Sequence, residues 1–288
     1  MNRRRRWNAT DLFLALTLAT LGVLATREVW ADIWRLATRD EENSYVLLAP
    51  FVAFWLGWIR RDRLRFVAPS RSLLGPAMIV IGWVLSTQGH RLEVDIAWHF
   101  GALLIVLGGA LSVLGRDAAR AVAPALLALL FLLPTPGTIR QQIAIPLQAA
   151  SAQAAEYLLD LIGVAVVRDG NLLRINGNEV AVAEACNGMR MVSALALVTF
   201  AFVFSTPMRH RIRAVFLVLS PLVALLVNII RLVPTALFYG YASPATAESF
   251  HTASGWIMLV IALGLLWTAL EVLRWLEVPL TPYAAPQT

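Results

Sequence analysis

Long apolar runs separated by short polar stretches make up most of the chain. Most of these runs approach the roughly 20 apolar residues that a helix needs to cross the hydrocarbon core of a bilayer. The pattern therefore predicts an all-α integral membrane protein with about eight transmembrane helices, joined by polar connections such as 27–43 and the short loop 239–250. The predicted helices span about 12–25, 45–59, 73–87, 96–114, 121–133, 186–204, 214–238 and 251–273.

One longer segment, 138–185, interrupts this pattern before the sixth predicted helix. Apolar residues at helical spacing over 141–161 predict an amphipathic helix, with Pro146 at its first turn or at a kink. The turn signals Asp-Gly and Asn-Gly lie between short apolar segments of 164–182, so this part predicts a β-hairpin. We expect a single domain, 1–288, with an insert at 138–185 and the functional helices at 186–274.

The composition agrees with a membrane protein and excludes several kinds of site. The chain is 59% hydrophobic and 15% charged, with a net charge of +6, and its mean hydropathy is +0.69. Every residue in the Lys and Arg count is Arg, so a Ser–Lys dyad and a Schiff-base lysine are excluded. The single cysteine excludes an internal disulfide and a cysteine-rich zinc site. We expect no cofactor and no metal. We also expect no nucleic-acid partner, because the arginines form short clusters between apolar runs.

These arginine clusters fall in alternate connections, at 3–6, 60–71, 116–120 and 209–213. By the positive-inside rule, the pattern predicts that both termini are cytoplasmic. The segment 138–185 and the loop 239–250 are then extracytoplasmic, as are the connections that contain Asp40 and Glu93.

Three side chains of consecutive predicted helices come to one depth near the extracytoplasmic face. Cys186 begins the sixth helix, where the positive end of the helix dipole favours a thiolate. Arg231 lies eighteen residues after Arg213, about 27 Å along the seventh helix, and His251 opens the eighth. Each residue also has an ordinary explanation: a small apolar filler, an arginine that reaches the headgroups, and a helix cap. His90 and His99 compete with His251, because they lie on the same predicted side.

A thiol, a guanidinium and an imidazole together fit acyl transfer. The thiolate would attack a carbonyl, the guanidinium would stabilise the oxyanion, and the imidazole would protonate the leaving amine. A polytopic transporter or an assembly subunit of an envelope or exopolysaccharide system remains an alternative. In a transporter, Arg231 and Arg190 would serve as anion ligands, and in an assembly subunit Cys186 would be inert.

The residues around these three side chains resemble the exosortase/archaeosortase family. The resemblance rests on Ala185-Cys186-Asn187-Gly188, on Asn228-Ile229-Ile230-Arg231, on the segment from His251 to Trp256, and on 44–50 near the N-terminus. It implies a cysteine transpeptidase of the bacterial inner membrane, with its active site on the extracytoplasmic side. Its partners would be the lipid bilayer and membrane-anchored proteins with a C-terminal sorting signal, a Pro-Glu-Pro-type motif before a membrane helix and a basic tail. The resemblance implies Cys186, Arg231 and His251 as catalytic residues, and we expect supporting roles for Glu184, Asn187, Gly188, Arg190 and Asn228.

Overall fold

The computed structural model describes residues 8–70, 72–135, 137–182, 188–206 and 208–275, and 82% of it is helical. The chain forms two compact units, Met1–Pro136 and Gly137–Thr288, called here the N-terminal and the C-terminal unit. The N-terminal unit contains α1 (Ala9–Ala25), α2 (Arg27–Arg39), η1 (Glu41–Leu48), α3 (Ala49–Ile59), α4 (Arg61–Leu64), α5 (Leu74–Arg91), α6 (Asp95–Ala121), α7 (Ala123–Ala128) and η2 (Leu129–Leu132). The C-terminal unit contains α8 (Gly137–Leu161), β1 (Val166–Asp169), β2 (Leu172–Ile175), β3 (Asn178–Ala181), α10 (Gly188–Ser205), α11 (His210–Tyr241) and α12 (Pro244–Trp275).

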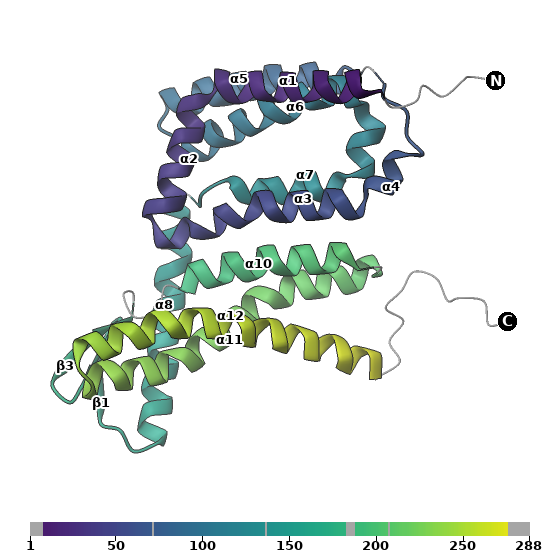
Figure 1. The fold of residues 1–288 in the computed structure, drawn as a ribbon. Coiled ribbons are helices and arrows are strands. Elements are labelled where there is room, and N and C mark those ends of the chain that lie inside the picture. Colours follow the sequence, from purple (N-terminus) through teal and green to yellow (C-terminus); the bar gives the residue numbers. More distant parts are fainter. Residues whose placement is uncertain (1–7, 71, 136, 183–187, 207, 276–288) are drawn as a thin grey trace. The chain divides into compact units, whose positions relative to one another are not determined.

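Glycines bring α5 and α6 into backbone contact in the N-terminal unit (Figure 1). A Cβ atom added at Gly82 would lie 2.6 Å from the carbonyl oxygen of Gly101, and one added at Gly89 would lie 2.4 Å from the nitrogen of Trp98. Such close approach is typical of membrane helices, whose association depends on van der Waals contact at small residues. The seven-residue spacing of Gly75, Gly82 and Gly89 keeps these contacts on one face of α5.

The helices of the N-terminal unit are bent or interrupted at two places. The helices α1 and α2 meet at a bend of 78°, and α2 occupies most of the stretch 27–43 that the sequence predicted as a polar connection. The polar connection is therefore largely helical, and α2 is amphipathic: Val29, Ile33 and Ala37 are buried at helical spacing, while charged residues and Trp34 lie on its exposed faces. In α6, Gly115 has φ +82° and interrupts the helix next to the predicted end of that span at residue 114.

In the C-terminal unit, α10, α11 and α12 pack through large apolar side chains. The buried cluster between them includes Leu195, Phe216, Val227 and Leu266. At one end of this bundle, Arg213 of α11 donates hydrogen bonds to backbone carbonyls of residues 203 and 206, at 3.0 and 3.3 Å. An arginine at this position satisfies carbonyl groups that the end of α10 leaves without helical partners.

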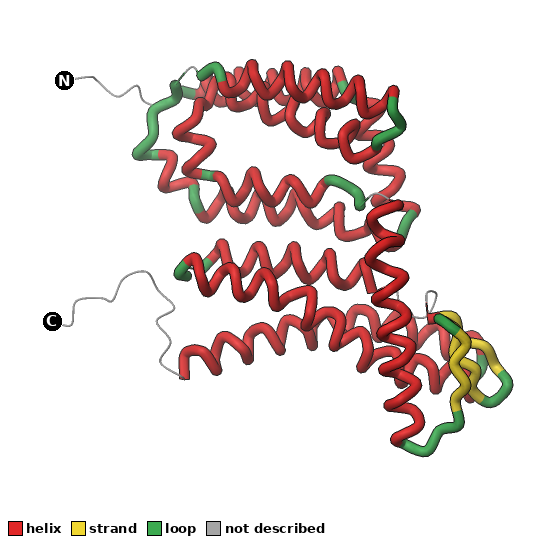
Figure 2. The backbone as a smooth tube through the Cα atoms, turned by 180° about the vertical axis from the view of Figure 1, so that it is seen from behind, coloured by secondary structure: helices red, strands yellow, loops and turns green. Residues whose placement is uncertain are grey.

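A small antiparallel sheet packs on the other end of α11. The strand order is β1-β2-β3, so the hairpin predicted over 164–182 is confirmed, and it consists of three strands joined by two turns. Two-residue turns join the strands, since Asp169 pairs with Leu172 and Ile175 pairs with Asn178. Figure 2 shows the sheet beside α8, and Arg168 of β1 binds Glu156 of α8 at 2.7 Å. The predicted amphipathic helix is α8, which continues through Pro146.

The connection between α11 and α12 is shorter than the predicted loop 239–250. Only Ala242 and Ser243 separate the two helices. Ser243 accepts a hydrogen bond from the backbone nitrogen of Thr246, and Pro244 occupies the first helical position, a common start signal. His251 therefore lies two turns inside α12, and the prediction that it opens the helix was wrong.

Three described helices are long and apolar enough to cross a membrane: Asp95–Ala121, His210–Tyr241 and Pro244–Leu273. The bent pair of α1 and α2 would be a fourth if it counts as one span. Ala123–Leu132 and Val192–Ser205 are apolar but shorter. The structure is thus that of a helical membrane protein, while the number of eight spans stays a prediction.

Candidate functional site

A buried polar face runs along the second half of α11. Asn228 and Arg231 are each 3% exposed, and Thr235 is fully buried. These positions are three or four residues apart, so they lie on one face of the helix, while Ile230 on another face is half exposed. A charge in an apolar helix faces the protein interior because transfer into lipid costs at least a few kcal/mol. The burial of Arg231 therefore excludes the alternative in which its side chain reaches the headgroups.

Hydrogen bonds within α11 satisfy only some of the polar groups on this face. The hydroxyl of Thr235 donates to the carbonyl of Arg231 at 2.8 Å. The side-chain oxygen of Asn228 is buried and has no hydrogen-bond partner among the described residues. A buried acceptor without a donor costs about 1–3 kcal/mol. Asn228 is thus a position where a hydrogen-bond donor of a bound molecule would be stabilised.

The first turns of α12 pack against the last turns of α11, which brings His251 into this region (Figure 1). The rings of Phe238 and Phe250 stack with centroids 4.2 Å apart. Along the helix axes, Arg231 lies about 15 Å before the end of α11, and His251 lies about 10 Å after the start of α12. The two residues are therefore at similar depth, within about one helical turn.

His251 itself is half-buried in the interior of α12. Its backbone carbonyl accepts a hydrogen bond from the hydroxyl of Ser254 at 2.9 Å, and Ser254 is buried. A position inside the helix rather than at its start means that His251 is not a helix cap. Ser254 and Thr235 are buried polar neighbours that the sequence reasoning missed, although each lies one turn after a predicted site residue.

Cys186 lies in the segment 183–187, outside the described residues, together with Glu184 and Asn187. Gly188 and Arg190 are in the first turn of α10, and the side chain of Arg190 lies outside the described part. The chain can be followed on both sides of this segment. Val182 before it is buried in one cluster with Leu232 and Ala236 of α11, and α10 after it contacts α8, α11 and α12. Val182, at the near end of the segment, thus packs against the helix that carries Arg231.

The competing histidines belong to the N-terminal unit. His99 of α6 is 1% exposed, and its Nε2 lies 3.0 Å from Oδ2 of Asp32 on α2. The ring of Trp98 stacks on His99 and also adjoins the ring of His90. The contact between Asp32 and His99 was not predicted, because it depends on α2 being a helix. A buried histidine held by a carboxylate has a structural explanation that does not require catalysis.

Among the described residues, no group of three His, Cys, Asp or Glu side chains is close enough to hold a metal ion.

In the comparison with protein families, a family model described as transmembrane exosortase matches residues 30–268, which is most of the chain. Comparison with curated proteins found no match. Comparison with solved structures found none either.

Proposed function

Because the chain belongs to the transmembrane exosortase family, we propose that it is a cysteine transpeptidase that cleaves a C-terminal sorting signal of membrane-anchored proteins. The observation that carries this proposal is the burial of Arg231 beside Asn228 on α11, at the depth of His251. A guanidinium held inside a bundle is suited to stabilise negative charge that develops during a reaction.

The proposed reaction begins when His251 takes the proton of the Cys186 thiol, and the resulting thiolate attacks the scissile carbonyl carbon of the substrate. The carbonyl electrons move to its oxygen, and the guanidinium of Arg231 donates hydrogen bonds to this oxyanion. When the oxyanion collapses, the C–N bond breaks, and His251 as the imidazolium gives its proton to the departing amine. The products of this half-reaction are a thioester on Cys186 and the free C-terminal peptide. Water or an acceptor amine then attacks the thioester and regenerates the thiol.

Asn228 has a supporting role in this proposal. Its buried side-chain oxygen has no described hydrogen-bond partner, so an N–H group of the substrate backbone is a suitable donor. Asn228 lies one turn from Arg231, hence one bound peptide can contact both side chains. Binding of the peptide would then place its carbonyl oxygen near the guanidinium. We assign no separate role to Glu184, Asn187, Gly188 or Arg190 beyond shaping the entry to α10.

The transporter alternative predicts helices that are broken at mid-depth. Instead, α11 is continuous from His210 to Tyr241 across Pro221 and Pro234. The hydroxyl of Ser220 donates to the carbonyl of Leu217 at 3.2 Å, and this carbonyl is the one that Pro221 cannot bond. Because Arg231 would be the anion ligand of a transporter, the continuity of the helix that carries it favours the peptidase.

A processing assay with matched protein levels tests the proposal. The full chain is co-expressed with a substrate that ends in a Pro-Glu-Pro-type motif, a membrane helix and a basic tail. We expect wild type to shorten the substrate and Cys186→Ala to leave it intact, because no other residue of the chain has a thiol. Mass spectrometry should detect a substrate acyl group on Cys186 that hydroxylamine removes. Normal processing by Cys186→Ala would refute the cysteine mechanism.

The side of the membrane is part of the proposal and needs its own measurement. Alternating arginine clusters place the connection near residue 66 in the cytoplasm and the sheet near residue 170 outside. Phosphatase and fluorescent-protein fusions at these two positions should therefore report opposite sides. Activity of both fusions on one side would refute the predicted topology, and with it the extracytoplasmic active site.

A further inference from the structure

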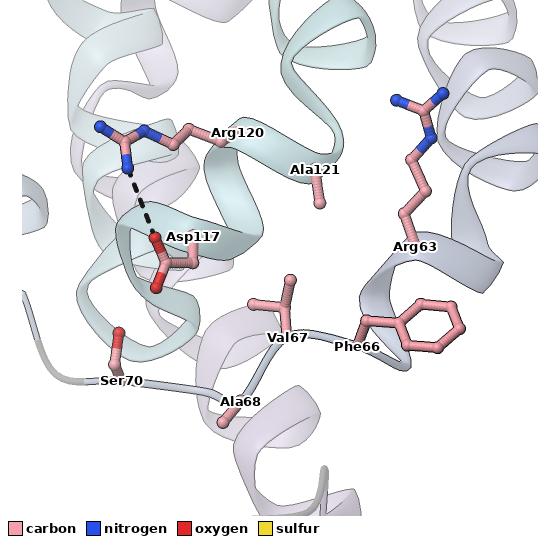
Figure 3. A pocket seen from close by; sticks show the side chains of 8 residues that line it. All are labelled: Arg63, Phe66, Val67, Ala68, Ser70, Asp117, Arg120 and Ala121. Atoms are coloured by element: carbon pink, nitrogen blue, oxygen red, sulfur yellow. Dashed lines mark ion pairs between the residues drawn. The ribbon is translucent and has the colours of Figure 1, made fainter. Parts of the chain in front are cut away.

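A pocket of about 720 Å³ opens in the N-terminal unit between the α4–α5 connection and the corner of α6 and α7. Figure 3 shows its lining residues: Arg63, Phe66, Val67, Ala68, Ser70, Asp117, Arg120 and Ala121. The side chains of Arg63 and Arg120 lie at opposite ends of this lining and do not point toward each other, and the apolar residues Val67, Ala68 and Ala121 lie between them. The volume is within the range of small-molecule sites.

Close backbone packing builds this pocket. Gly115 in α6 has φ +82°, and a Cβ atom added there would lie 2.3 Å from the carbonyl oxygen of Ser70. Only glycine permits both this conformation and this approach. The connection that carries Phe66 to Ser70 is therefore held against the kink in α6, and the pocket is part of the fold rather than a gap between loops.

The pocket also lies at the depth of lipid headgroups. The straight part of α6 before Gly115 contains about 20 residues and is therefore about 30 Å long, which equals the hydrocarbon thickness of a bilayer. The kink and the pocket follow directly after it. The exposed ring of Phe66 and the ring of Trp58 under Arg61, at 4.2 Å, are aromatic groups typical of this boundary.

The charges of the pocket favour an anion. Arg63 has no carboxylate partner among the described residues, and Arg120 pairs only with Asp117, at 3.6 Å. Both members of that pair are exposed, and such a pair contributes little. Arg116 and Arg65 lie close by in sequence, so the local field is positive. Asp117 opposes an anion and limits its affinity.

We propose that this pocket binds the phosphodiester headgroup of an anionic phospholipid of the surrounding bilayer. The exposed side chains of Arg63 and Arg120 can turn toward the phosphate oxygens, Ser70 donates its hydroxyl, and Phe66 and Val67 contact the glycerol and upper acyl carbons. Guanidinium groups suit phosphate because they donate several hydrogen bonds in one plane. The apolar wall favours a lipid over a soluble phosphate. This site is independent of the proposed peptidase reaction.

Lipid titration of the purified full chain tests this inference. Phosphatidylglycerol or phosphatidylcholine is added in mild detergent, and native mass spectrometry measures the bound fraction. Wild type should prefer phosphatidylglycerol, and the double variant R63Q/R120Q should lose about tenfold in affinity for it. The control R61Q/R65Q removes the same charge from the same region outside the pocket and should retain most of the affinity. Asp117→Asn should bind phosphatidylglycerol more tightly than wild type.

Two results would overturn the inference. Equal losses in R63Q/R120Q and R61Q/R65Q would mean that net charge alone attracts the lipid. Displacement of phosphatidylglycerol by equimolar glycerol 1-phosphate would mean that the pocket is a site for soluble phosphate. The side chains concerned are exposed, so the variants should fold, and their unfolding temperatures in detergent check this.

Discussion

The α5–α6 pair of the N-terminal unit and the α10–α12 bundle of the C-terminal unit are packed in different ways. Where α5 meets α6, glycines remove side chains and let the backbones touch. In the C-terminal bundle, side chains such as Phe216 and Leu266 keep the helices apart. Helices in backbone contact leave no volume between them, whereas helices separated by side chains can enclose polar groups.

This difference explains where the functional chemistry can lie. The face of α11 inside the C-terminal unit holds Asn228, Arg231 and Thr235, all buried. The backbone contact between α5 and α6 has no comparable row, and His99 lies on α6 facing α2 instead. We therefore interpret the glycine contact as a rigid support and the C-terminal bundle as the place of reaction.

The largest effect should follow from Arg231→Lys. Lysine keeps the charge but lacks the planar set of donors that can hold an oxyanion and a neighbouring carbonyl together. We expect processing of the sorting-signal substrate to fall by about 10²–10³-fold. Arg213→Lys, at the other end of α11, is the matched control, because a lysine can still donate to the carbonyl of Val203. Similar losses in both variants would contradict a special role for Arg231.

The histidines of the two units provide the second test. His251→Ala should lower processing by roughly 10²-fold, since the departing amine loses its proton donor. His99→Ala removes the contact with Asp32 and should lower the unfolding temperature more than the rate per folded molecule. His90→Ala should be mild. Normal processing by His251→Ala together with a large loss in His99→Ala would contradict His251 as the proton donor and would indicate His99 instead.

The smallest effect should be on stability, from Gly101→Leu. A side chain at Gly101 would lie 2.4 Å from the backbone nitrogen of Ser86 and would push α5 away from α6. Such overpacking typically costs about 1–3 kcal/mol. Gly264→Leu on α12 is the control, because nothing lies within 4 Å of a Cβ atom added there. The stability of both variants is measured as the midpoint of thermal unfolding in detergent. Equal midpoints for Gly101→Leu and Gly264→Leu would contradict a stabilising role of the glycine contact between α5 and α6.

Much of the fold could be predicted from hydropathy and turn signals. The apolar run 214–238 lies within α11, and the two Gly-containing turns join the three strands as expected. Helix ends were predicted less well. The helix α2 was missed because its hydrophobic residues occupy only one narrow face, and the start of α12 was missed because the Ser243-Pro244 signal lies before its apolar run.

The sequence by itself determined which segments are apolar, where the two turns between the strands lie, and that the chain has a single thiol, at Cys186. These properties depend on neighbours within a few residues along the chain. Only the tertiary structure decided that Arg231 is buried, that His99 contacts Asp32, and that Arg63 and Arg120 line one pocket. Each of these depends on which helix faces pack together, and residues far apart in the chain set that packing.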